Sequence, residues 1–182
     1  TLYPDQNNFP TSQAGNLLLP LSVKSTKTNT ISLASPPSGE SKITEVTFDR
    51  YDSKGNILQY TLKTGVPVAI VWGYNQTQPI AKIEGATYAQ VEPYITDIIS
   101  KSNADTDSVS EQTLINALDD FRNKSNLSYH QITTYSYDPL IGVTSITPPS
   151  GIREVYHYDT TNRLQSVVDV NGNILKEFSY NY

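Results

Sequence analysis

The sequence predicts a mainly β protein in which antiparallel β-hairpin repeats form a twisted sheet or strip, with a two-helix hairpin inserted between them. Two observations predict the sheet: Tyr-Asp or Tyr-Asn dipeptides recur at nearly constant intervals, and apolar and polar residues alternate around them. A third observation predicts the helices, because the apolar residues of one segment recur every three or four positions instead.

Five dipeptides define the repeat. Successive tyrosines are 23, 63, 21 and 22 residues apart, and removal of the 41 residues 86–126 shortens the long interval to 22. A period of this length is typical of proteins built from one supersecondary unit per repeat. The dipeptides are Tyr51-Asp52, Tyr74-Asn75, Tyr137-Asp138, Tyr158-Asp159 and Tyr180-Asn181.

Further columns of residues agree when the repeats are aligned on the tyrosine. The residues six positions later are Ile57, Ile80, Val143 and Leu164, and those nine positions later are Tyr60, Ile83, Ile146 and Val167. The glycines fourteen positions later are Gly65, Gly151 and Gly172. The aromatic residues two positions earlier are Trp72, Tyr135, Tyr156 and Phe178. The first repeat departs from this last rule, with Asp49 in that column and Phe48 beside it.

Each repeat is predicted to be two strands joined by a turn. The strand that enters the tyrosine alternates in character, a polar turn such as that at Asp159 follows, and a second strand runs to a glycine-containing turn. Asn171-Gly172 predicts a two-residue hairpin turn, because both residues tolerate positive φ. The columns six and nine positions after the tyrosine cannot share one face of a regular strand. The sequence is compatible with a bulge or with burial on both faces.

A hairpin of this size cannot bury its own apolar face in water, so it must pack on its neighbours. The aromatic residue two positions before each tyrosine falls on the same strand face as that tyrosine. We therefore expect successive aromatic pairs to form a ladder across the sheet. The last strand, within residues 174–182, is then an open edge, and we expect copies to pair through it or residues 1–16 to cover it.

Residues 86–128 are predicted to be a helical insertion. Thr87 and Gln90 form a capping box, and Pro93 either kinks the helix that follows or lies in the first turn of a later one. Ser108 and Glu111 form a second capping box. The simplest arrangement is two antiparallel helices on one face of the sheet, and their apolar stripes favour a plug over a partner-binding lid. The stripes comprise Val91, Ile95, Ile98, Ile99, Leu114, Ile115, Leu118 and Phe121.

The other parts of the chain lie on either side of this insertion. Residues 43–85 hold the first two repeats, and residues 129–182 hold the third, the fourth and the start of a fifth. Residues 1–42 are predicted to be an extended strand-loop region, with loops over 1–16 and 32–42 and a strand over 17–24. Residues 43–48 alternate in character and predict the next strand.

Composition argues against several classes of function. The formal net charge of −5 disfavours nucleic acid as a partner, and the absence of cysteine removes disulfides, thiolate zinc sites and cysteine nucleophiles. The longest apolar runs are too short to span a bilayer. The chain contains no methionine and begins at Thr1 without a secretory signal pattern, so we interpret it as a processed piece of a longer polypeptide.

The sequence contains few candidate catalytic residues. The two histidines are His130 and His157, and a general base needs a nucleophile and an orienting carboxylate nearby. Asp138 and Asp159 are available, but a residue type required in every repeat is explained by turn capping. Residues 169–173 carry oxygen ligands without the ligand order of an EF-hand loop, which favours a hairpin turn over calcium. We therefore expect no enzyme activity, no metal and no cofactor.

The aromatic residues two positions before the tyrosines have two interpretations. Aromatic rings stack on sugar rings, so these residues would form a glycan-binding surface if they lined an open groove. Alternatively they are buried between the strands and the helical pair, which we favour because large exposed apolar patches are uncommon on soluble proteins. The candidate ligand-stacking set comprises Trp72, Tyr135, Tyr156 and Phe178.

Several segments of the chain resemble a known family. The YD repeats of the bacterial RHS (rearrangement hotspot) family are similar to "RYDSKGNILQY", "YSYDPLIGVTSITPPSG" and "YHYDTTNRLQSVVDVNGNILKEFSYNY". Large secreted YD-repeat proteins of Bacteroidetes are similar to "VWGYNQTQPIAKIEGAT" and "YDPLIGVTSIT". The resemblance covers residues 43–182. It implies a long β-strip that spirals into a shell; in some relatives the shell encloses a C-terminal toxin, and others contact carbohydrates or cell surfaces.

The chain departs from the family pattern at the turns. The usual Gly-Arg after the turn is Gly55-Asn56 and Asn162-Arg163 here, and Gln78-Pro79 is the most divergent pair. The family's Asp-Pro motif, which is tied to self-cleavage ahead of a toxin, is not found at the end of the chain. Asp138-Pro139 lies inside a repeat, and we assign it no catalytic role.

From the residues and the resemblance we expect a non-enzymatic structural segment of a large bacterial YD-repeat protein, secreted or at the cell surface in association with the outer membrane. Its partners would be the neighbouring repeats of the same polypeptide. One alternative is a module that binds carbohydrate or another cell-surface protein through the aromatic face. A second is part of a toxin-delivery shell whose toxin domain lies outside this chain.

Overall fold

The computed structural model of the protein describes residues 17–26 and 42–180. Within these residues ten antiparallel strands form one sheet, accompanied by three α-helices. The strands follow one another across the sheet in sequence order, from β1 to β10, and the sheet is not closed. The mainly β fold class predicted from the sequence is therefore confirmed. The chain divides into two compact units, residues 1–68 and 69–182, which we describe in turn.

The first unit contains β1 (Ser22–Thr26), β2 (Lys42–Tyr51) and β3 (Ile57–Leu62), with β2 paired antiparallel to both neighbours. The strand expected over 17–24 begins later, at Ser22. Pro20 has no N–H to donate to a ladder, and the Leu19 side chain packs against the turn at Gly55 instead. The strand expected over 43–48 lies within β2. The loop expected over 1–16 lies outside the described residues, as does that over 32–42 up to residue 41.

An additional irregularity in β2 explains why the first repeat departs from the aromatic column. Tyr51 pairs with Ile57, Arg50 with Gln59, and Phe48 with Tyr60, so Asp49 is passed over. Phe48 thereby pairs with the residue nine positions after Tyr51. Tyr135 and Tyr156 pair with the residues of the same column in the later hairpins.

The second unit contains the remaining strands, apart from the first two residues of β4. From β5 to β10 each strand pairs antiparallel with the next. All four residues of β10 are exposed, and it is the last strand of the sheet. These strands are β4 (Pro67–Gly73), β5 (Gln78–Glu84), β6 (Gln131–Asp138), β7 (Gly142–Thr147), β8 (Glu154–Tyr158), β9 (Leu164–Asp169) and β10 (Ile174–Glu177).

A bulge recurs in the hairpins of this unit. In β8–β9, Tyr158 pairs with Leu164, His157 with Ser166 and Tyr156 with Val167, so Gln165 has no partner. In β6–β7 the same pattern of pairs leaves Thr144 without a partner. The extra residue turns the positions six and nine after the tyrosine to one face of the sheet. Of the two arrangements compatible with the sequence, the structure has the bulge.

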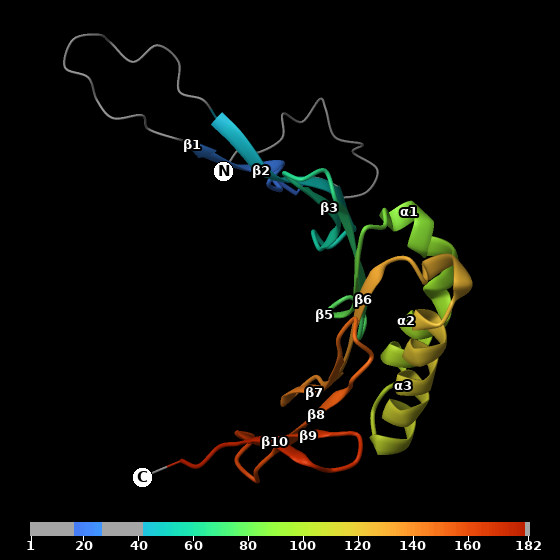
Figure 1. The fold of residues 1–182 in the computed structure, drawn as a ribbon, viewed down its shortest axis with the longest axis vertical. Coiled ribbons are helices and arrows are strands. Elements are labelled where there is room, and N and C mark those ends of the chain that lie inside the picture. Colours follow the sequence, from blue (N-terminus) through green and yellow to red (C-terminus); the bar gives the residue numbers. More distant parts are fainter. Residues whose placement is uncertain (1–16, 27–41, 181–182) are drawn as a thin grey trace, which may run out of the picture. The chain divides into compact units, whose positions relative to one another are not determined.

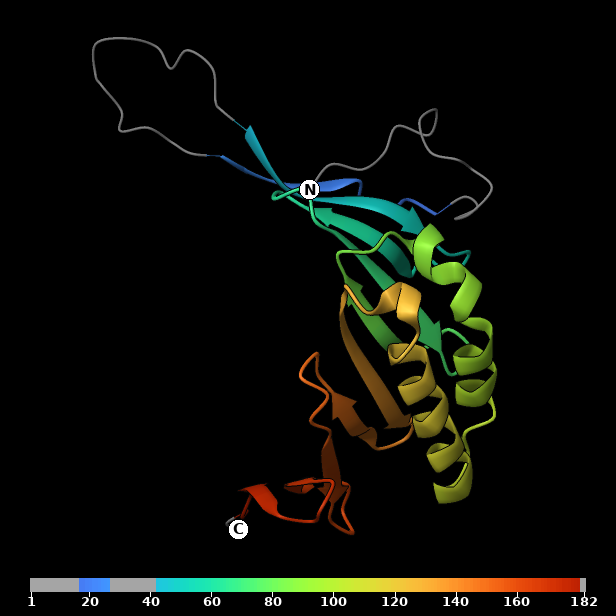
Figure 2. The same cartoon turned by 45° about the vertical axis from the view of Figure 1, so that its right-hand side comes forward.

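The insertion folds as a bent first helical segment and a longer second helix, which lie side by side next to β5 and β6 (Figures 1 and 2). The expected capping box of Thr87 and Gln90 is present, and Pro93 sits in a 3₁₀ turn that breaks the first segment in two. No helix in the described part of the chain is both long and apolar enough to cross a membrane. The helical elements are α1 (Tyr88–Val91), η1 (Glu92–Tyr94), α2 (Thr96–Asn103), α3 (Ser108–Arg122) and η2 (Ser125–Leu127).

The second capping box forms one residue earlier than expected. Asp107 is the N-cap of α3, in extended conformation, and its Oδ1 accepts the N–H groups of Val109 and Ser110. Ser110 takes the reciprocal position, since its hydroxyl accepts the Asp107 N–H. The prediction of Ser108 and Glu111 as the box is wrong because Asp107 is an equally good cap and comes first in the chain. Glu111 is thereby free to face the sheet.

The helices cover the face of the sheet that carries small polar side chains. In β6, Ile132, Thr134 and Ser136 alternate along one face and are buried. Ser136 donates to Glu111 Oε1 of α3 over 3.1 Å, which satisfies a polar group beneath the helix. Tyr135 points to the opposite face. The expectation that the helical pair buries the aromatic set is therefore wrong, because the helices cover the face that carries Ile132, Thr134 and Ser136, opposite to that of Tyr135.

Candidate functional site

The predicted ligand-stacking residues of β6 and β8 lie on the sheet face that points away from the helices. Tyr135 is opposite Ile146, Ile146 is opposite Glu154, and Tyr156 is the next residue on that face. The Tyr156 hydroxyl donates to Glu154 Oε2 over 2.9 Å. Both tyrosines are half-buried, so part of each side chain is open to solvent.

Trp72 and Phe178 complete the set. A Cβ at Gly73 would lie 2.2 Å from Ser102 Oγ of α2, so Gly73 faces the helices, and the pleat of β4 directs Trp72 to the other face. Trp72 is half-buried. Phe178 follows β10, where its N–H donates to the carbonyl of Gln165 over 3.0 Å, and 40% of its surface is exposed.

The tyrosines of the dipeptides donate their hydroxyl groups to backbone carbonyls. Tyr158 donates to Val143 O over 2.9 Å, and Tyr180 donates to Leu164 O over 2.8 Å. Val143 and Leu164 occupy one column, six residues after the tyrosine of the preceding repeat, so each hydroxyl fastens one hairpin to the one before it. Two further bonds run from a dipeptide tyrosine hydroxyl to a backbone carbonyl, from Tyr137 to Pro79 O over 2.9 Å and from Tyr51 to Pro20 O over 2.6 Å.

Tyr74 uses its hydroxyl differently, to tie the helical insertion to the sheet. The hydroxyl donates to Asp105 Oδ2 over 2.7 Å and accepts the Tyr137 N–H over 2.9 Å, while the two tyrosine rings meet edge to face at 5.7 Å. Burial raises the pKa of Tyr74 well above its ordinary value, so the phenol stays protonated and can donate. Asn75 adds a second tie, from its N–H to Asn103 Oδ1 over 2.7 Å.

Asp159 caps its turn with both carboxylate oxygens. Oδ1 accepts the N–H groups of Thr161 and Arg163 over 2.8 and 3.0 Å, and Oδ2 accepts Arg163 Nε over 2.8 Å. Hydrogen bonds from Thr161 and Arg163 hold the pKa of Asp159 far below its ordinary range. The carboxylates of Asp52 and Asp169 cap their turns in the same way.

The turn after Asp169 differs from the two-residue hairpin that Asn171-Gly172 predicts. Gly172 has a φ of 82° and donates its N–H to Asp169 O, but Asn171 is not among the described residues with positive φ. The reason is the Asp169 carboxylate, which accepts the Asn171 N–H and closes a longer loop. Gly65 and Gly151 take the same place in their turns, each with a φ of 81°.

The turn at Asp138 ends beneath the ring of Tyr158. Asp138 Oδ1 accepts the N–H of Leu140 over 3.0 Å. At the end of the turn a Cβ on Gly142 would lie 2.8 Å from the Tyr158 hydroxyl oxygen. Glycine is therefore needed at 142 for Tyr158 to reach the carbonyl of Val143.

The two histidines lie apart from each other in the unit. His157 is exposed in β8 opposite Ser166, and His130 is half-buried after η2, at the edge of a cavity. Among the described residues there is no group of three or more histidine or carboxylate side chains placed to hold a metal ion.

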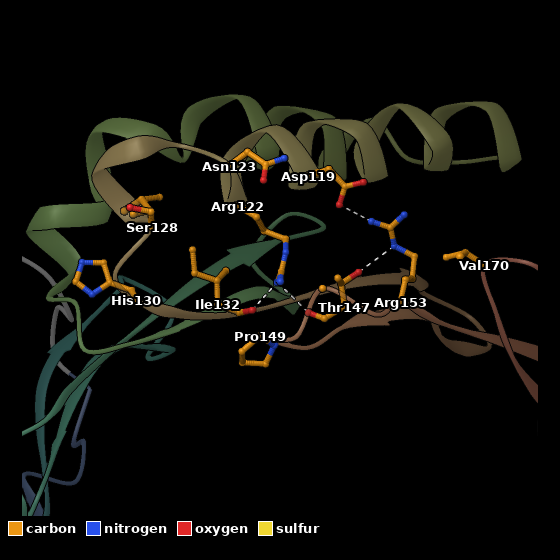
Figure 3. Close-up of a pocket in the computed structure, with 12 residues that line it drawn as sticks. Asp119, Arg122, Asn123, Ser128, His130, Ile132, Thr147, Pro149, Arg153 and Val170 are labelled. Carbon is orange, nitrogen blue, oxygen red and sulfur yellow. Dashed lines mark hydrogen bonds and ion pairs between the residues drawn. The ribbon is translucent and has the colours of Figure 1, made fainter.

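A cavity of about 550 Å³ lies between α3 and the ends of β6 and β7. Figure 3 shows Arg122 reaching from α3 toward the backbone of Ile132 and Thr147, and Arg153 between Asp119 and Thr147. Arg122 donates to the carbonyls of Ile132, Thr147 and, over 2.7 Å, Pro148. It thereby holds the C-terminal turn of α3 against the sheet.

The second arginine of the cavity comes from the loop before β8. Arg153 forms an ion pair with Asp119 of α3 through Nη2, and its Nε donates to Thr147 Oγ1 over 2.9 Å. Burial lowers the pKa of Arg122, and the positive charge of Arg153 acts in the same direction against the opposing effect of Asp119. Neither arginine was predicted from the sequence, because no spacing relates residue 122 of a helix to residue 153 of a loop.

Comparison with other proteins adds no family to these observations. No protein-family model matches the chain, and the search of curated proteins finds no similar sequence.

Proposed function

We propose that this chain is a non-enzymatic structural segment of a large secreted or cell-surface YD-repeat protein of the RHS type, in which consecutive hairpins build a scaffold or shell. The proposal rests on the bond from a dipeptide tyrosine to the carbonyl six residues after the preceding tyrosine, which occurs at Val143 and at Leu164. A scaffold that grows by addition of hairpins needs an equivalent link at each step.

Two further recurring features support the proposal. A bulge near the start of the second strand is found in both β6–β7 and β8–β9, and it presents the same pair of apolar columns to one face each time. The carboxylates of Asp52, Asp159 and Asp169 use both of their oxygens in backbone and side-chain hydrogen bonds, which is a structural use of a group that catalysis would need free. The partners of such a segment are its neighbouring repeats.

The test asks whether one hydroxyl couples two hairpins. In Tyr158→Phe only the bond to Val143 is lost, and we expect amide hydrogen exchange to accelerate in β6 and β7 as well as in β8 and β9, by up to about fivefold for a bond of about 1 kcal/mol. Tyr129→Phe is the matched control, since Tyr129 is 92% exposed. Acceleration confined to β8–β9 would show that the hairpins are energetically independent, and the scaffold proposal would fail.

The toxin-delivery shell is a version of the same proposal in which a toxin domain follows the repeats. It requires a compact, charge-rich and non-repetitive domain downstream of this segment in the full polypeptide. Sequencing of the gene beyond the codon for Tyr182 decides between the two versions without bearing on the scaffold itself.

Carbohydrate binding is the second candidate, and one observation favours it. The helices leave the aromatic face uncovered, with Tyr135 and Tyr156 half-buried and Phe178 40% exposed. Half-exposed aromatic rings on a flat strand face are the kind of surface that stacks on sugar rings. A partner protein with an apolar surface would use the same face.

A glycan array measured with Tyr156→Ala separates this candidate from the scaffold. The candidate predicts glycan binding that is lost in Tyr156→Ala with little change in melting temperature, while His157→Ala, on the opposite face, binds normally. Absence of binding to any glycan by the unaltered protein would remove the candidate.

A further inference from the structure

The cavity beneath α3 concentrates positive charge in a chain whose formal net charge is −5. Two arginines enter it from different elements, Arg122 from α3 and Arg153 from the loop before β8. Among the described residues that line it, Asp119 is the one carboxylate, so these three side chains leave a net charge of +1. The volume of about 550 Å³ is within the range of small-molecule sites, about 300–1,000 Å³.

Arg122 is held in place without being neutralised. Its three acceptors are backbone carbonyls, which carry no net charge, and no ion pair in the described part of the chain includes it. A guanidinium has five N–H groups, and these bonds use both on Nη1 and one on Nη2. Among the described residues no acceptor is recorded for the Nε hydrogen or for one Nη2 hydrogen, so these two remain for a ligand.

Arg153 is also fixed and also has donors left. Its side chain is only 16% exposed, with Nε committed to Thr147 and one Nη2 hydrogen to Asp119. Within the described residues, neither hydrogen of Nη1 has an acceptor. A fixed arginine with open donors loses little side-chain entropy when an anion binds, which favours binding.

The rest of the cavity is partly apolar. Leu127 and Ile132 line it on the side of η2 and β6, and Pro149 and Val170 line it on the side of the turns. Figure 3 shows Val170 beside the end of Arg153 and His130 at the other end of the cavity. A ligand here needs one anionic group and a compact apolar body.

We infer that this cavity binds a small organic monocarboxylate, with its carboxylate on the open donors of Arg153 and Arg122 and its apolar part against Pro149 and Val170. One negative charge matches the net charge of the three side chains, and planar carboxylates fit the donor fork of arginine. A doubly charged phosphate binds less well because Asp119 opposes the second charge. This site is independent of the hairpin links on which the scaffold proposal rests.

Solution NMR of isotope-labelled protein tests the inference with N-acetyl-leucine as the probe. We expect the Nε–H signals of Arg122 and Arg153 to shift and saturate at millimolar acid, as for a small weakly binding ligand. N-acetyl-leucinamide, the neutral control of equal size, should shift neither signal, and inorganic phosphate should bind more weakly than the acid. Equal effects of acid and amide, or no saturable shift with the acid, would overturn the inference.

Two variants move the affinity in opposite directions. Asp119→Asn removes the negative charge beside Arg153 and should bind the acid about fivefold more tightly, because one opposing charge at about 4 Å is removed. Arg153→Gln should lose binding, whereas Arg163→Gln, at an ion-paired arginine in the β8–β9 turn, should bind normally. The melting temperature checks that Arg153→Gln folds. If it does not, unchanged or weaker affinity in Asp119→Asn is sufficient to refute the site.

Discussion

Removal of the Tyr74 hydroxyl tests how the helical insertion is held to the sheet. Tyr74 is 5% exposed, and its hydroxyl sits between the Asp105 carboxylate and the Tyr137 N–H. Tyr74→Phe keeps the ring and its edge-to-face contact with Tyr137 but deletes both hydrogen bonds. The change therefore isolates one oxygen atom that connects the α2–α3 loop, the β4–β5 turn and β6.

The expected loss follows from the two bonds. A hydrogen bond to a charged group contributes about 1.5–3 kcal/mol, and a buried donor left without an acceptor costs about 1–3 kcal/mol. Asp105 is only half-buried, so water can replace its lost partner and the first contribution falls at the low end. The Tyr137 N–H loses the acceptor that the hydroxyl provides. We expect Tyr74→Phe to lower the free energy of unfolding by about 2–4 kcal/mol.

Urea unfolding at pH 7, followed by circular dichroism, measures this loss. The midpoint should fall at an unchanged m-value, since the folded and unfolded surfaces are nearly the same. Tyr129→Phe, at a 92% exposed position, should leave the midpoint in place. A loss below about 0.5 kcal/mol for Tyr74→Phe, the size of ordinary surface substitutions, would refute the reasoning that this hydroxyl anchors the insertion.

Three other substitutions have defined outcomes. Gly142→Ala places a Cβ 2.8 Å from the Tyr158 hydroxyl oxygen at a φ of 153°. Urea unfolding should show a larger loss in the free energy of unfolding than for Gly151→Ala, where a Cβ meets nothing within 4 Å. Equal losses would contradict the contact. Burial raises the pKa of Asp105, so the folded protein binds a proton more readily than the unfolded chain. The free energy of unfolding therefore rises as the pH falls from neutral through that raised pKa toward the ordinary carboxyl value of about 4. Asp105→Asn should raise the free energy of unfolding at pH 7 and flatten this rise; an unchanged pH profile would contradict the assignment. Arg122→Met removes the guanidinium bonds to three carbonyls, of which Pro148 O still accepts the Gly151 N–H, and should destabilise by about 2 kcal/mol or more in calorimetry; a loss under about 1 kcal/mol would show that other contacts hold α3.

The strand and helix pattern could be predicted because it depends on local periodicity. Alternation around the dipeptides identified β6 and β8, and the helical stripe that includes Leu114 and Phe121 identified α3. Two apolar columns three positions apart were compatible with a bulge or with burial on both faces, and the sequence did not decide between them. The unpaired residues at Thr144 and Gln165 are the physical form of the bulge.

Features that depend on competition between similar groups could not be predicted. Asp107 and Ser108 are both good N-caps, and only the extended backbone of Asp107 decides between them. Polar residues such as Thr134 and Ser136 read as solvent-facing in a strand pattern, yet they lie beneath α3. Glu111 supplies the acceptor that makes this burial favourable.

The cavity and the turn at Tyr74 depend on contacts far apart in the sequence. Arg122 and Arg153 come together only because α3 packs over β6 and β7. At Tyr74 three successive residues have positive φ, which is uncommon without glycine, and the bond from Tyr74 to Asp105 helps to hold them there. No local sequence pattern predicts either arrangement.

The central claim is that the hydroxyl groups of Tyr137, Tyr158 and Tyr180 each reach the hairpin before their own, and contacts between protons measured by NMR test it most directly. For Tyr158, the ring protons should show nuclear Overhauser contacts to the Hα of Gly142, and for Tyr137 they should show contacts to Pro79 and to the ring of Tyr74. Ring contacts confined to each tyrosine's own hairpin would contradict the account, because the hydroxyl groups could not then reach the carbonyls of the preceding repeat.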